Sequence, residues 1–238
     1  MSRAVDARRR LATRSIWILA EKRAETLNSL TFRKERGMKS ARHFIAIGLI
    51  LVTSPVFSAV PTTGVAKYDA SIRKAIGYLK QEILSPKNVV HGGYLSFTAY
   101  TLLQAGEPVS SEPVKKAIDE LKTRITSAGY KPDNAEHHIY DAGVDAMLLS
   151  KAGGDNYYAE LKAISDYIIA QQGSDGSWDY PSRTVGDTSM GQYGALGLWA
   201  AMVGGVDVPK EVWDKLAVWH LRTQQPDGKF VPNFLGDV

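Results

Sequence analysis

The sequence predicts an all-α fold built from helical hairpins. Two classes of segment alternate along the chain from about residue 60: charged amphipathic segments, and segments rich in small and apolar residues. Stretches with the period of a β-strand are nearly absent, and glycine and proline clusters fall between the helix-like segments. Such an alternation is typical of stacked supersecondary units, none of which can bury its apolar face alone.

The amphipathic class recurs four times, in segments that begin at Lys74, Lys116, Lys162 and Lys215. Each carries apolar residues at helical spacing and a charged opposite face, which predicts outer helices with one face in water. The apolar positions are Ile72, Ile76 and Leu79, then Val114, Ile118, Leu121 and Ile125, then Leu161, Ile164 and Ile168, and finally Val212, Leu216 and Trp219.

The second class occupies residues 92–106, 140–154 and 191–205, between the amphipathic segments. These stretches are poor in charge, and each ends in glycine, which commonly stops a helix. A helix that is apolar around its whole circumference is normally covered on all sides. We therefore expect three inner helices that are buried by the outer ones.

Two amphipathic segments end in a shared pattern, aromatic-aliphatic-x3-Gln-x3-Gly-x-Trp. The stretches are YIIAQQGSDGSW and WHLRTQQPDGKF, and the second copy has His for the aliphatic residue and Phe for Trp. A Gln there can satisfy backbone groups at the helix end, the glycine can turn the chain inward, and the Trp plane can pack against the Gln. The residues concerned are Gln172, Gly176 and Trp178 in the first copy, and Gln224, Gly228 and Phe230 in the second.

This pattern resembles the QW repeat of squalene and hopene cyclases. The chain from residue 60 to 238 is similar throughout to the squalene cyclase and protein prenyltransferase superfamily, especially to exported bacterial proteins with the prenyltransferase/squalene-oxidase repeat. The resemblance implies an α/α toroid whose inner helices line a cavity. The sequence holds only about three and a half hairpins, roughly half of a full ring. We expect an incomplete, arc-like toroid or a C-terminally truncated one.

The resemblance also directs attention to Asp187. In the cyclases the cluster Asp-x-Asp-Asp-Thr-Ala opens an inner helix, and its middle aspartate donates the proton. The matching stretch here is TVGDTS, with Gly186 at the donor position. The prenyltransferase zinc motif Asp-x-Cys becomes Asp187-x-Ser189. An aspartate before a small, apolar helix is typical of an N-cap. We favour this role for Asp187, with a catalytic acid or ligand as the alternative.

The densest group of ionisable residues lies in the stretch DNAEHHIYDAGVD. Asp141 and Asp145 are four residues apart and share a helical face, where like charges repel unless a cation lies between them. One interpretation is an acid or metal site that uses both aspartates, with His137 or His138 as a ligand. The favoured interpretation is a polar loop followed by a capped helix, with one aspartate turned to solvent.

Aromatic residues on the expected inner helices are candidate ligand contacts. In a cyclase such rings would face a carbocation and stabilise it, whereas elsewhere aromatics at helical spacing form ordinary core. The candidates are Tyr94, Tyr100, Tyr140, Tyr193 and Trp199, with Phe97 on the same helices.

Residues 38–59 carry the order of a secretory signal peptide. A positive MKSARH precedes the apolar FIAIGLILV, and Val56-x-Ser58 offers a cleavage site. We expect export to the periplasm or beyond, with an uncleaved membrane anchor as the alternative. Residues 1–37 are then an untranslated or disordered upstream extension. Their Arg and Lys clusters lack the interleaved aromatics and fold signature of a nucleic-acid module, which disfavours nucleic acid as a partner.

Two functions remain open. The chain has no cysteine, which excludes a thiolate nucleophile and a thiolate metal site. We expect no cofactor and no metal. The favoured function is non-catalytic binding of an apolar small molecule or a protein partner, with a homo-oligomer possible through the open end of the arc. The alternative is a terpenoid cyclase or prenyltransferase-like enzyme acting on an isoprenoid, with Asp187, Asp141 or Asp145 as acid or ligand.

Overall fold

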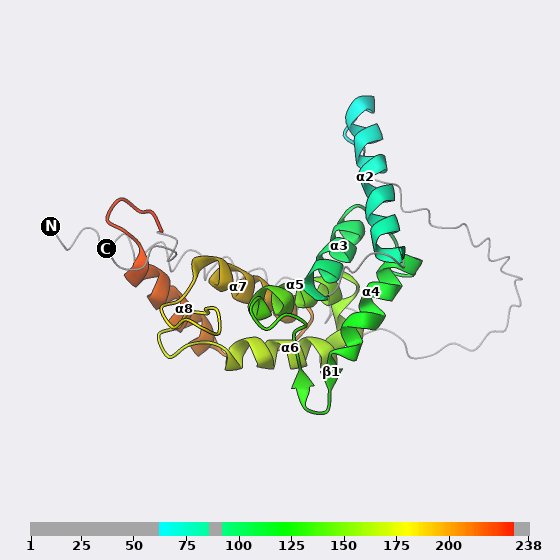
Figure 1. Cartoon of the computed structure of the whole chain (residues 1–238). Helices are drawn as coiled ribbons and strands as arrows, with labels where there is room; N and C mark the ends of the chain where they lie inside the picture. The colour runs from blue at the N-terminus through cyan, green and yellow to red at the C-terminus, as the bar shows by residue number, and fades with distance from the viewer. Residues whose placement is uncertain (1–61, 86–91, 231–238) are drawn as a thin grey trace, which may run out of the picture. The chain divides into compact units, whose positions relative to one another are not determined.

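The computed structural model describes residues 62–85 and 92–230, and this part of the chain is mostly helical (Figure 1). The expected signal peptide, the upstream extension and the C-terminal VPNFLGDV lie outside the described residues. The helices are α2 (Ala66–Leu84), α3 (Gly92–Gln104), α4 (Glu112–Thr123), α5 (His138–Lys151), α6 (Tyr158–Ala170), α7 (Thr188–Val203) and α8 (Lys210–Thr223). A short 3-10 helix, η1 (Gly154–Tyr157), precedes α6, and β1 (Ile125–Thr126) pairs antiparallel with β2 (Gly129–Tyr130).

The all-α prediction is confirmed, and each predicted segment forms a helix. The four amphipathic segments are α2, α4, α6 and α8, and the three small-residue segments are α3, α5 and α7. One assignment was wrong: Ile125 does not belong to the helix before it. The helix α4 ends at Thr123, and Ile125 pairs with Tyr130 in the β1–β2 hairpin, where its side chain still packs against the core.

The helix α5 lies at the centre of the small-residue layer, in contact with both α3 and α7. Glycines permit the close approach of α5 and α7. A Cβ on Gly143 would lie 2.6 Å from the carbonyl oxygen of Tyr193, and one on Gly197 would lie 2.9 Å from the Cα of Gly143. Because neither glycine has a side chain, the two backbones meet directly.

The helices α4, α6 and α8 bury the faces that the periodicity predicts, whereas on α2 Ile76 is buried and Ile72 and Leu79 are half-buried. The α4 residues Val114, Ile118 and Leu121 are buried, with Pro113 in the first turn. On α6 the buried apolar residues are Leu161, Ile164 and Ile168, and on α8 they are Val212, Leu216 and Trp219. These side chains belong to, or pack beside, the buried core that the small-residue helices share.

The expectation that the small-residue helices are covered on all sides holds for α5, where every residue before Lys151 is buried or half-buried, but it was wrong for α3 and α7. On α7, Trp199 is 63% and Val203 is 64% exposed, and on α3, Tyr94 is 74% exposed. The helices α5 and α6 cover one side of α7, and the opposite side remains open in the described structure. An apolar composition therefore did not ensure burial, because the described part of the chain covers only one face of this layer.

The two Gln-containing turns share their backbone hydrogen bonds. In the first, the Gly173 N–H donates to the Ser177 carbonyl at 2.8 Å; in the second, the Gln225 N–H donates to the Lys229 carbonyl at 2.8 Å. The Gln172 amide donates to the carbonyls of Gly176 and Val212, at 3.1 and 3.0 Å. Gln172 therefore ties the turn to α8, whereas we had expected it to satisfy backbone groups at the end of its own helix.

The two turns share their glycine conformation but differ in the burial of their aromatic residues, Trp178 and Phe230. Gly176 and Gly228 both take a left-handed φ, of 93° and 87°, as a turn glycine can. Trp178 is 1% exposed, and its indole N–H donates to the Ile168 carbonyl at 2.8 Å. Phe230 is 40% exposed, so only the first copy anchors its aromatic residue in the core.

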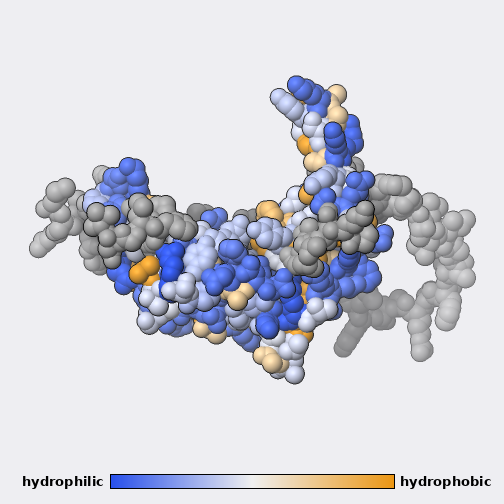
Figure 2. All heavy atoms as spheres, viewed as in Figure 1, coloured by the Kyte–Doolittle hydropathy of each residue, from blue (hydrophilic) through white to orange (hydrophobic). Residues whose placement is uncertain are grey.

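Hydrophilic residues form most of the described surface in the view of Figure 2, with small separate patches of hydrophobic residues. Within the described ranges, no helix combines the length and the apolar character needed to cross a lipid bilayer.

Candidate ligand pocket

The open faces of the small-residue helices form one wall of a pocket of about 460 Å³. Side chains from α3, α5 and α7 line it together with two loops, one before α5 and one between α6 and α7. The lining residues are Gly93, Tyr94, Phe97, Asp133, Asn134, His137, Tyr140, Asp141, Val144, Tyr180 and Tyr193. The volume and the mixture of aromatic and polar groups fall in the range of small-molecule sites.

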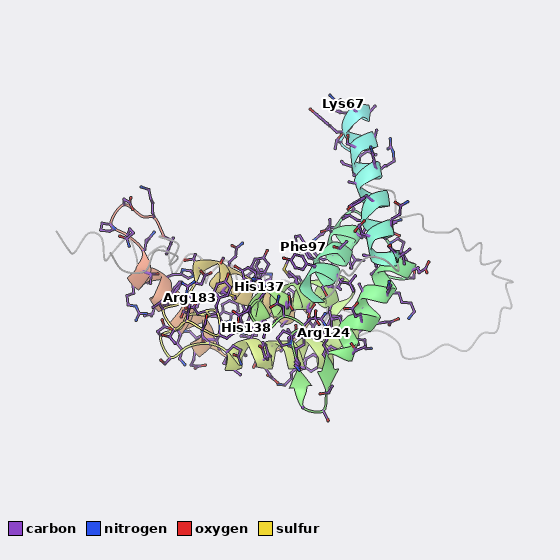
Figure 3. The ribbon with its side chains drawn as sticks, in the orientation of Figure 1. Lys67, Phe97, Arg124, His137, His138 and Arg183 are labelled. Atoms are coloured by element: carbon purple, nitrogen blue, oxygen red, sulfur yellow. The ribbon has the colours of Figure 1, made fainter. Side chains whose placement is uncertain are left out.

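Helical spacing explains how α3 and α5 present their pocket residues. Tyr94 and Phe97 are three residues apart on α3, and Tyr140 and Val144 are four apart on α5, so each pair shares a face. Figure 3 labels Phe97 on α3 and His137 at the start of α5.

The Tyr140 ring lies at the centre of the aromatic cluster. Its centroid is 4.7 Å from that of Tyr193 and 5.8 Å from that of His137, which meets it edge to face. The His137 ring also lies 6.1 Å from Tyr180, again edge to face. Tilted and edge-to-face pairs are the favoured geometry of neighbouring rings, so the cluster fixes the pocket wall in one arrangement.

Three of the five predicted aromatic contacts line this pocket: Tyr94, Tyr140 and Tyr193. The other two do not. The Tyr100 hydroxyl accepts a hydrogen bond from Gln104 on its own helix, and Trp199 lies on the exposed stripe of α7. Sequence reasoning missed Tyr180, since it lies in the long loop between α6 and α7 and no pattern in the sequence marks it.

Asp187 caps α7. Its backbone is extended, with φ −123°, and its carboxylate accepts from the amides of Ser189 and Met190 at 2.9 and 3.0 Å. Asp187 is buried and does not line the pocket. The capping geometry predicted from the sequence is therefore present.

A chain of hydroxyl groups nevertheless connects Asp187 to the pocket. The Tyr140 hydroxyl donates to the Ser189 hydroxyl at 2.5 Å, and the Ser189 hydroxyl donates to Asp187. The Tyr180 hydroxyl hydrogen-bonds to Tyr140, and this bond is the main reason that the pKa of Tyr180 rises to about 12. The cap residue thus also orients two of the rings that line the pocket.

We predict that Asp187→Ala lowers the free energy of unfolding by about 1 kcal/mol, because two first-turn amides lose their acceptor. Asp187→Asn should cost less, since an asparagine side chain also caps well. Urea unfolding followed by circular dichroism measures both. If the alanine variant were as stable as the wild type, the capping assignment would be wrong.

Asp145 belongs to a buried network rather than to the pocket. Its carboxylate is inaccessible to solvent and lies 2.8 and 3.0 Å from the two terminal nitrogens of Arg124, the C-cap residue that follows α4. The Tyr130 hydroxyl donates to it at 2.6 Å. Burial raises the pKa of the Asp145 carboxyl, and the Arg124 guanidinium opposes that rise. Figure 3 labels Arg124.

Asp141 joins two segments at one edge of the pocket. One carboxylate oxygen accepts from the Gly93 amide at 3.2 Å, and the other accepts from the Asn134 amide at 2.9 Å. Burial raises the pKa of Asp141. Our expectation that Asp141 or Asp145 faces solvent was wrong, because both are buried; Arg124 supplies the cation that their spacing called for.

The two neighbouring histidines, His137 and His138, have different partners. His137 lines the pocket, and its Nδ1 is 3.1 Å from the side-chain Nδ2 of Asn134. His138 is buried, with Nδ1 3.0 Å from the Tyr167 hydroxyl and Nε2 3.1 Å from the Asp179 carbonyl. Across the described residues, no group of three or more His, Asp or Glu side chains is placed to hold a metal ion.

A second cavity, of about 670 Å³, lies beside His138 and Tyr167. Loop residues such as Ser174, Asp175 and Thr184 form much of its wall. We regard the smaller cavity as the better candidate, because helices hold most of its rings and a rigid aromatic wall suits ligand binding.

Comparison of the chain with protein-family models, with curated proteins and with solved structures gives no match.

Proposed function

We propose that this chain is an exported binding protein of the squalene-cyclase and prenyltransferase-like repeat type, which holds an apolar small molecule without transforming it. One observation carries the proposal: five tyrosine and phenylalanine rings line a pocket of about 460 Å³, while Asp187, the aspartate that remains of the expected acidic motif, serves as a helix cap outside it. The buried carboxyl of the lining, Asp141, already accepts from the backbone amides of Gly93 and Asn134, so a pocket with this much aromatic surface suits binding better than proton transfer.

The open face of the small-residue helices supports the non-catalytic form of this proposal. Under it, the hairpins stack as an open arc of a toroid, with α3, α5 and α7 on the inner side. Cyclisation through a carbocation needs a chamber that excludes water. Tyr94 and Trp199 are largely exposed, so water reaches this face. The same exposure would suit a protein partner or a second copy of the chain at the open side.

An enzymatic alternative draws on the hydroxyl chain. Because Tyr140 and Ser189 connect the pocket to Asp187, a proton could pass between the carboxyl and a bound isoprenoid. This alternative requires product formation from squalene or farnesyl diphosphate. The proposal expects none.

Farnesol is the probe that tests binding. We predict saturable binding of farnesol to the full chain in equilibrium dialysis, and about tenfold weaker binding to Phe97→Ser, which removes a ring of the pocket wall. Trp199→Ser is the matched control, since Trp199 is an exposed ring on the same layer that does not line the pocket. Equal loss in both variants, or no binding to the wild type, would contradict the proposal.

A further inference from the structure

We infer that the natural ligand carries an ammonium group, with an apolar body, and that the pocket recognises a small organic cation. This inference rests on the proposed function and narrows it to one chemical class. It is carried by the juxtaposition of aromatic faces and carboxylates in a pocket whose lining includes no lysine or arginine.

The charged lining groups have one sign. Asp133 and Asp141 both line the pocket; burial, and to a smaller extent the negative charge of Asp133, raise the pKa of Asp141. Asp141 is already engaged with the amides of Gly93 and Asn134. Asp133 is exposed, so its carboxylate is the one that a bound cation can meet. An anionic ligand would find two like charges and no basic lining residue.

The aromatic lining, like the carboxylates, attracts a cation. A cation over the face of a tyrosine or phenylalanine ring is attracted by the ring's quadrupole, and the attraction strengthens as water is excluded. Tyr94 and Phe97 are 74% and 48% exposed on the face of α3 that lines the pocket, so a ligand can reach their rings. Tyr140 and Tyr193, which are only half-buried, extend the wall across α5 and α7.

A neighbouring arginine shows that this combination of groups already holds a cation elsewhere in the fold. The guanidinium of Arg183 lies 5.6 Å from the Tyr180 ring centroid and 3.6 Å from the Asp179 carboxylate, so this region already pairs a cation with an aromatic face and an acid. Arg183 lines the second cavity and not the aromatic pocket. The aromatic pocket offers the same combination to a ligand from solution.

The decisive experiment compares two ligands of the same shape. Benzyltrimethylammonium and neopentylbenzene differ only in a charged nitrogen in place of a carbon. Equilibrium dialysis with the full chain should show at least about tenfold tighter binding of the cation. Phe97→Leu keeps an apolar side chain but removes the ring, and Asp133→Asn removes the charge. Each should weaken cation binding by about threefold or more and leave neopentylbenzene nearly unchanged.

Four outcomes decide between the two proposals. A preference for the cation that both variants reduce supports the inference. Equal binding of the two ligands, or a preference that neither variant changes, overturns the inference and leaves apolar binding intact. If neither ligand nor farnesol binds, the proposed function fails as well. If the chain co-sediments with phosphatidylcholine vesicles but does not bind free benzyltrimethylammonium, the inference of a small-cation ligand is also overturned, because the recognised species would then be a membrane surface.

Discussion

Arg124→Leu is expected to lower the free energy of unfolding by about 3–5 kcal/mol, which is enough to unfold a marginally stable chain. The substitution leaves the Asp145 carboxylate buried without the guanidinium that pairs with it, although the Tyr130 hydroxyl still donates to it. A buried carboxylate without its partner must either bear the desolvation cost or take up a proton. Urea unfolding followed by circular dichroism measures the loss.

Two controls separate this cost from the loss of side-chain packing. The double variant Arg124→Leu/Asp145→Leu removes both charges and should recover much of the stability, since an apolar replacement of a buried pair is often near neutral. Lys162→Leu breaks a pair with Asp166 that is exposed on both sides, and should change the free energy of unfolding far less than Arg124→Leu does. A loss at Arg124 as small as that at Lys162 would contradict the assignment of a buried network.

Trp178→Ala is expected to cost about 3–5 kcal/mol. Trp178 is among the largest fully buried side chains, and its indole N–H is bonded to the Ile168 carbonyl on α6. Its ring packs so closely on α7 that a Cβ on Gly194 would lie 2.9 Å from it. Removing the ring therefore opens a cavity between the two helices that the surrounding backbone cannot fill.

Phe230→Ala provides the comparison within the same motif. Phe230 occupies the equivalent position of the second turn, but it is 40% exposed, so its removal should cost under about 1 kcal/mol. Both variants are measured by the same urea unfolding. Equal costs at the two positions would show that the motif, and not the burial of Trp178, determines the effect.

The helices could be predicted because their signals are local. Periodic apolar residues such as Val114, Ile118 and Leu121 lie on one helical face whatever the rest of the chain does. The cap at Asp187 was equally accessible, since a cap residue bonds to amides two and three positions along the chain. The turn glycines Gly176 and Gly228 could also be predicted, because the left-handed backbone that a turn needs at one residue is a local requirement.

The composition of the candidate site depended on contacts between distant segments. Arg124 and Asp145 are 21 residues apart, and no local pattern shows that the end of α4 meets the side of α5. Tyr180 reaches the pocket through the path of a loop. The exposure of Trp199 depends on what covers α7, which the residues of α7 do not encode. All three features depend on tertiary contacts. The wrong expectation that Asp141 or Asp145 faces solvent has the same cause.

The most direct test of the account locates a bound apolar ligand. A diazirine derivative of farnesol is photo-crosslinked to the full chain at saturation, and the modified residues are assigned by mass spectrometry. The account predicts modification at the pocket, on Tyr94, Phe97, Tyr140, Tyr180 or Tyr193, and its suppression by unlabelled farnesol. Modification confined to the exposed stripe of Trp199 and Val203, or labelling that farnesol does not suppress, would contradict it.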